Sequence, residues 1–222
     1  MSANSGGQVA VFIESGSRRV FASALDWPGW ARSGKSEQLA LAALADYLRR
    51  YEAIVALAGL PGPGDAQLVV TERHPGVAKG ADFGALGEIA TSERAPLTPQ
   101  AGTRLAVLLE AAWAAFDWGA EQAPPRLRKG PRGGGRDTEQ IVQHVLGAEA
   151  MYSRKMGLAR DKAAEAGHDP AGLLRSRVTT ALRAPAELPA GPNQWPPRYA
   201  ARRMAWHVLD HLWEIEDKSD PA

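Results

Sequence analysis

The sequence predicts an α+β unit of β-β-β-α-β order followed by an all-α, up-down four-helix bundle. Short strand-like runs separated by turns occupy the first 75 residues, whereas amphipathic helical patterns follow residue 97. The chain has 222 residues, of which 45% are hydrophobic and 23% charged, which is enough for two folded cores. We therefore expect domains over residues 1–75 and 98–222, joined by a linker or irregular cover over residues 76–97.

The first unit is expected to open with a β-hairpin. Residues 8–14 and 18–25 are rich in β-branched and aromatic side chains and flank a Ser-Gly-Ser turn. A Pro-Gly turn and a short third strand follow, after which Ser36 is well placed as the N-cap of one long helix that runs to about Ala58. Residues 66–72 then predict a last strand.

Capping residues and prolines mark the helices of the second part. Thr98 with Pro99, and Asp169 with Pro170, each combine an N-cap with a proline at the first helical position. The four helices are expected over about residues 98–119, 137–158, 169–182 and 199–217. Apolar side chains recur at helical spacing in each of them, which favours helices that pack against one another.

The composition limits the function. The chain contains no cysteine, which excludes disulfides, thiolate metal sites and an internal thiol nucleophile and favours a reducing compartment. The N-terminal residues lack the pattern of a secretory signal, and no run approaches the ~20 apolar residues of a membrane span. The net charge of +1 argues against a dedicated nucleic-acid binder. We expect a cytoplasmic protein without a membrane partner.

Three of the five histidines lie on the second and fourth predicted helices. His207 and His211 are one turn apart and project from one face, and His144 has an equivalent border position on the other helix. Three neutral imidazoles form a ligand set for zinc or nickel that leaves positions open for water or substrate. The alternative is that these are ordinary amphipathic border residues. Asp210 and Glu214 are either acceptors for the imidazole N–H groups, a general base or a solvated acidic edge, and no catalytic role is assigned.

Arg132 and Arg136 belong to a basic, glycine-rich segment over residues 126–136, just before the second helix. Such a segment at a helix N-terminus can close over an anionic cofactor or substrate, because glycine backbone approaches anions closely. A mobile, solvated loop is the competing interpretation. We expect Arg132 and Arg136 to bind a cofactor.

Residues 97–217 resemble the DinB-like superfamily of metal-binding four-helix bundles. The resemblance depends on a histidine in the second helix and on the segment HVLDHLWEIED in the fourth. It implies that His144, His207 and His211 bind zinc or nickel. It also implies transfer or isomerisation with a low-molecular-weight thiol such as mycothiol or bacillithiol, so that an enzyme of this kind would be a metal-dependent thiol S-transferase or hydrolase.

The segment LDWPGWARSGKS over residues 25–36, followed by a long helix, is similar to HicB-like antitoxin domains. The likeness spans residues 8 to about 72 and implies a β-β-β-α-β fold, while the role of this unit stays open. We expect a small-molecule substrate, and a homodimer is left open. The rival hypothesis is a non-catalytic binding or interaction protein in which the metal site is structural or vestigial.

Overall fold

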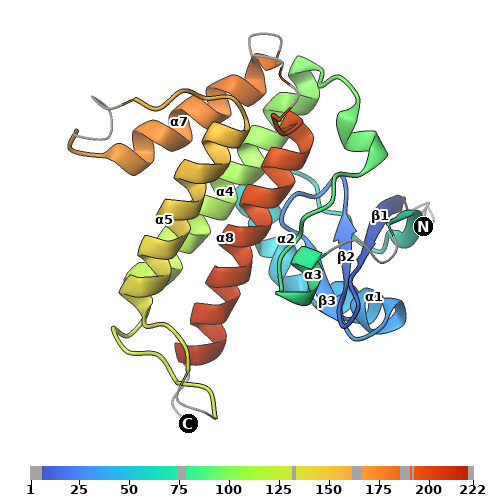
Figure 1. Ribbon diagram of the computed structural model, residues 1–222, viewed down its shortest axis with the longest axis horizontal. Coiled ribbons are helices and arrows are strands. Elements are labelled where there is room, and N and C mark those ends of the chain that lie inside the picture. The colour runs from blue at the N-terminus through green and yellow to red at the C-terminus, as the bar shows by residue number, and fades with distance from the viewer. Residues whose placement is uncertain are drawn as a thin grey trace, which may run out of the picture. The chain divides into compact units, whose positions relative to one another are not determined.

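The computed structural model describes residues 7–74, 79–131, 134–161, 167–185, 191 and 193–219. The chain divides into two compact units, Met1–Ala95 and Pro96–Ala222 (Figure 1). The first is an α+β unit and the second is helical, in the order predicted from the sequence. No helix in the described part of the chain has the length and apolar run needed to cross a membrane.

The first unit contains a mixed sheet of four strands. The strands are β1 (Gln8–Ser15), β2 (Val20–Ala24), β3 (Ala31–Gly34) and β4 (Gln67–His74). Their order across the sheet is β3-β2-β1-β4, with antiparallel pairs except for β4, which runs parallel to β1. The parallel pair requires a crossover, and the helical segment between β3 and β4 supplies it. The predicted order of strands and helix is present.

Two helices stand where the sequence predicted one. Helix α1 spans Glu37–Asp46 and helix α2 spans Leu48–Leu57, with Tyr47 between them. The Oγ of Ser36 accepts from the amide of Leu39, which confirms the predicted N-cap. The indole N–H of buried Trp30 donates to the carbonyl of Leu44 at 2.7 Å. This contact lies in the last turn of α1, next to the junction at Tyr47.

The described residues after β4 cover the β1–β2 hairpin. They form the short helix α3 (Lys79–Asp82) and the 3-10 turn η1 (Thr91–Arg94). The Asp82 carboxylate accepts from the Ser17 hydroxyl and from the amides of residues 17–19, and these hydrogen bonds lower the pKa of Asp82 to about 2. Buried Glu14 accepts from the amides of Gly87 and Glu88. The first unit therefore continues to Ala95.

Four long helices build the second unit, and Figure 1 shows α4, α5 and α8 running alongside one another with α7 crossing at an angle near one end. They are α4 (Pro99–Gln122), α5 (Thr138–Lys155), α7 (Pro170–Arg183) and α8 (Pro197–Ser219). Helix α4 packs against α7 and α8, and helix α5 packs against the same two. The side chains of Thr98 and Asp169 cap α4 and α7 as the sequence predicted.

A glycine allows α4 and α7 to approach closely. A Cβ atom on Gly102 would lie 1.9 Å from the Leu182 carbonyl oxygen, so only glycine fits at this crossing. Helix α8 carries the most buried residues of the unit, among them Met204, Val208 and Leu212. Helix α8 therefore lies in the centre of the unit, and its histidines face α5.

Candidate metal centre

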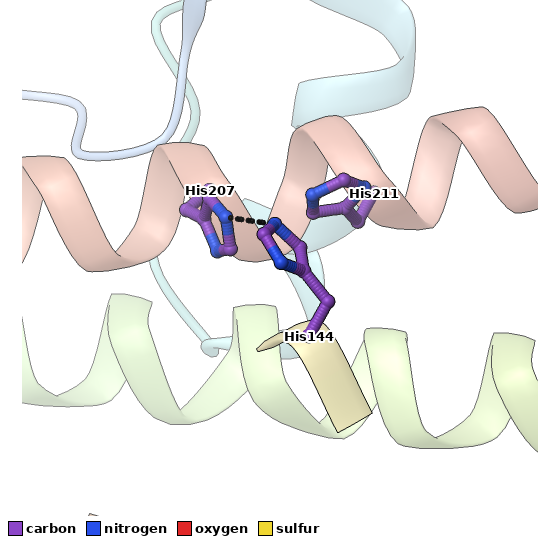
Figure 2. Close-up of side chains that lie close together, drawn as sticks. All are labelled: His144, His207 and His211. Atoms are coloured by element: carbon purple, nitrogen blue, oxygen red, sulfur yellow. Dashed lines mark hydrogen bonds between the residues drawn. The ribbon is translucent and has the colours of Figure 1, made fainter. Parts of the chain in front are cut away.

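Three imidazoles meet between α5 and α8. His144 lies on α5, and His207 and His211 lie on consecutive turns of α8 (Figure 2). Their ring centroids are 4.7 to 4.9 Å apart, and one ring nitrogen from each lies within 4.8 Å of the other two. The sequence predicted these three residues as one group, and the structure brings them close enough to hold one metal ion.

Antiparallel packing of α5 and α8 produces this meeting point. At one end the amide of Trp195, just before α8, donates to the carbonyl of Lys155 at the end of α5. At the other end the amide of Arg128, in the loop before α5, donates to the carbonyl of Lys218 at the end of α8. The middle of one helix therefore faces the middle of the other, which brings His144 opposite His207 and His211.

The nitrogen separation suits a shared ion. The Nε2 atoms of His144 and His207 are 3.1 Å apart. Two nitrogens bound to one zinc ion at ~2.0–2.1 Å would lie ~3.3 Å apart at a tetrahedral angle and ~2.9 Å apart at a right angle. The observed distance lies between these values, so both Nε2 atoms can ligate one ion without a large movement of either helix.

The third ligand is held in orientation by a carboxylate. The Nδ1 of His211 donates to Glu214 Oε2 at 2.7 Å, and Lys218 Nζ donates to Glu214 Oε1. These contacts, led by the one with His211, lower the pKa of Glu214 to about 2. A carboxylate on Nδ1 leaves Nε2 of His211 available to a metal and makes the ring a better donor. Of the roles considered for Glu214, the structure supports acceptor for an imidazole.

The surroundings of His144 and His207 favour the neutral imidazole. His207 and His211 are each 8% exposed, and His144 is the more exposed of the three. Burial is the main cause that lowers the pKa values of His144 and His207, the latter to about 2. The positive charge of Arg136 acts in the same direction on both, while the charge of Glu214 raises the pKa of His144. Metal ligation requires the unprotonated ring, so this environment prepares the ligands for a cation.

Aromatic side chains enclose His207. The rings of Tyr152 and Trp206 lie 5.7 Å and 6.2 Å from its ring, measured between centroids. The guanidinium carbon of Arg203 is 5.3 Å from the Tyr152 ring centroid and 4.8 Å from that of Trp206. The packing of α5 on α8 brings Tyr152 to Arg203 and His207.

The basic segment before α5 lies at the same end of the two helices as Lys218. Arg128 donates from its guanidinium to the carbonyl of Asp217, and Lys129 pairs with Asp137. Arg136 is exposed, and its charge is near enough to lower the pKa values of two of the histidines. Arg132 lies outside the described residues. The geometry thus brings one of the two predicted cofactor-binding arginines into the neighbourhood of the imidazoles.

The carboxylate behind His211 gives a direct test of the ligand arrangement. Replacing Glu214 with glutamine is expected to weaken zinc affinity about 10- to 100-fold, because the neutral amide orients and polarises the ring less strongly. Competition with a chromophoric chelator measures the affinity. Glu216→Gln, an exposed carboxylate on the same helix, is the control and should change it less than about twofold. Equal affinities of Glu214→Gln and the parent protein would contradict this role.

Comparison with known proteins adds no assignment to this geometry. No protein-family model, curated protein or solved structure matches the chain.

Proposed function

We propose that the helical unit is an up-down four-helix bundle of the DinB-like type that holds one divalent ion, zinc or nickel, on His144, His207 and His211. The convergence of these three imidazoles from two helices is the observation that carries the proposal. Among the described residues the cluster consists of these side chains, a ligand number that leaves positions open for an exchangeable ligand. Nitrogen ligands of this kind suit zinc and nickel.

Electrostatics favours an anion as that exchangeable ligand. Neutral imidazoles do not compensate the charge of a divalent ion, and Arg136 and Arg203 add positive charge near the rings. A thiol or a water molecule held by such an ion loses its proton near neutral pH. Because the chain has no cysteine, a thiolate would come from outside the protein.

We propose transfer of a low-molecular-weight thiol, such as mycothiol or bacillithiol, to a small electrophile. In an addition, the new bond joins sulfur to the electrophilic carbon, the π bond between that carbon and its neighbour breaks, and the proton that the thiol loses ends on the neighbouring carbon, so the step needs no oxidant or reductant. Glu214 and Lys218 hold His211, while Tyr152 and Trp206 shield His207 from water. Arg132 and Arg136 would bind the carboxylates of an anionic thiol such as bacillithiol. Hydrolysis by the same centre is the variant that uses water instead.

The first unit is proposed to be HicB-like. Three strands, a helical crossover made of α1 and α2, a fourth strand and the sheet order β3-β2-β1-β4 support this. The proposal extends to the fold alone, and the chemistry described above is placed in the helical unit.

Calorimetric titration of mycothiol, bacillithiol and glutathione into untagged, zinc-loaded protein tests the proposed function. We expect one thiol to bind the loaded protein at least about 100-fold more tightly than the metal-free protein, because the ion supplies its main contact. The double variant Arg132→Ala and Arg136→Ala should bind that thiol less tightly at unchanged metal content, whereas Arg154→Ala, an exposed arginine on α5, should not. Metal content without binding of any thiol would overturn the thiol assignment in favour of hydrolysis or a non-catalytic metal site.

A further inference from the structure

Arg203 lies one helical turn before His207 on α8 and shares its aromatic surroundings. The Tyr152 and Trp206 rings that contact His207 also lie against the Arg203 guanidinium. The positive charge of Arg203 also contributes to the lowered pKa of His207. An arginine is thus built into the wall beside the candidate metal ligands.

Two buried nitrogens in this wall have no acceptor among the described residues. They are Nη1 of Arg203 and Nδ1 of His207. When Nε2 of His207 ligates a metal, Nδ1 carries the ring proton, so both atoms are donors. A buried donor without an acceptor is costly, and more so when it is charged. His211 differs, because its Nδ1 donates to Glu214.

A carboxylate would satisfy what these donors lack. It offers one oxygen to Nη1 of Arg203 in a charge-assisted contact and the other to Nδ1 of His207, and its single negative charge matches the single charge of Arg203. We infer that Arg203 and His207 Nδ1 form a carboxylate subsite next to the metal centre, so that the preferred ligand of the centre is a small acid. The inference rests on the proposed function for the metal and names the ligand class that the same site selects.

The role assigned to Arg203 is that of a specificity-determining residue. Arg203 selects ligands of the metal centre by their negative charge, while the three histidines bind the ion. Ligands with a carboxylate near the metal-bound group should therefore depend on Arg203, and uncharged ligands of the same shape should not.

A pair of thiols that differ by one carboxylate tests the subsite. N-acetylcysteine and N-acetylcysteamine are titrated into untagged, full-length, cobalt(II)-loaded protein, and binding is followed by the sulfur-to-cobalt absorption band. We expect N-acetylcysteine to bind about tenfold more tightly, the size of one charge-assisted contact. In Arg203→Gln this ratio should fall to about one, with N-acetylcysteamine affinity changed less than about twofold.

Two further variants separate the local contact from other effects. Arg154→Gln removes a charge from the exposed surface of α5 and should leave the tenfold ratio in place. Arg203→Lys keeps the charge and should retain part of the ratio, about threefold, because lysine lacks the planar fork. Cobalt content and far-ultraviolet circular dichroism of each variant show that the site and fold are intact. If Arg203→Gln does not fold, the Arg203→Lys result decides.

The outcomes distinguish this inference from the proposed function. Equal binding of the two thiols to the parent protein would overturn the carboxylate subsite and leave the thiol function standing. If neither thiol binds, the thiol function fails, and acetate against acetamide on the cobalt-loaded protein decides the subsite. An acetate-dependent change in the cobalt spectrum that weakens about tenfold in Arg203→Gln would support it. No response to acetate would overturn it.

Discussion

Replacing His207 or His211 with alanine is expected to reduce the metal content of the untagged protein from about one ion per chain to near zero. Each is one of three ligands, and both are 8% exposed in the contact between α5 and α8. Two remaining imidazoles bind a divalent ion far more weakly, so we expect the dissociation constant to rise at least about 100-fold. Elemental analysis after dialysis measures the content.

Matched variants make this result specific. His168→Ala removes an exposed histidine outside the cluster and should leave the metal content unchanged. His144→Ala should also lose the ion, and because His144 is the more exposed residue, it should cost less folding stability than His207→Ala. A His207→Ala protein that keeps one zinc or nickel ion per chain would contradict the three-histidine site.

Helix ends of the second unit could be predicted because they are set by neighbouring residues. Thr98 and Asp169 each accept from a backbone amide three residues later, and a proline follows each cap. Such contacts lie within one turn, so sequence spacing alone identifies them. The same holds for His207 and His211, whose common face follows from their spacing of four residues.

Features set by distant contacts could not be predicted. The break at Tyr47 lies next to a distant contact, in which the Trp30 indole reaches Leu44 across 14 residues. The periodicity of residues 36–58 is that of one helix. It reports local spacing and contains no information on a contact from a residue outside the segment. Arg203 shows the same difficulty: its place beside Tyr152 and His207 depends on how α5 packs against α8.

Glu214 and Lys218 are an intermediate case. Their spacing of four residues on α8 predicts an ion pair, and His211 is three residues before Glu214. The sequence could therefore indicate the pair, but whether Glu214 turns to His211 or to solvent depends on burial of that helix face. Only the packed structure decides this.

The second large expected effect is on folding stability and concerns a buried ion pair between α5 and α7. Arg175 on α7 contacts Glu149 of α5 through Nε at 3.0 Å and Nη2 at 3.1 Å, and it also reaches Asp117 of α4. The Glu149 side chain is 3% exposed. Arg175→Met leaves this carboxylate buried without its cation, so we expect a loss of about 3–5 kcal/mol in the free energy of unfolding. Chemical denaturation measures it.

The control is a surface ion pair whose arginine lies on α7, as Arg175 does. Arg183 contacts Glu110, and the two side chains are 38% and 42% exposed. Arg183→Met should therefore cost less than about 1 kcal/mol. Combining Arg175→Met with Glu149→Leu should recover most of the stability, because an apolar pair removes the need to bury a charge. Failure of this rescue would show that the arginine acts through other contacts.

The pH dependence of Arg175→Met tests the cause of the loss. Burial already raises the pKa of Glu149 above its ordinary value despite Arg175, which acts in the opposite direction. Without the arginine the pKa rises further, so the folded state keeps a proton that the unfolded state releases above about pH 4.5. The variant should therefore be closest to the parent at acidic pH and lose stability as the pH rises through the new pKa of Glu149. Denaturation at several pH values checks this, and a stability gap independent of pH would contradict the buried-charge explanation.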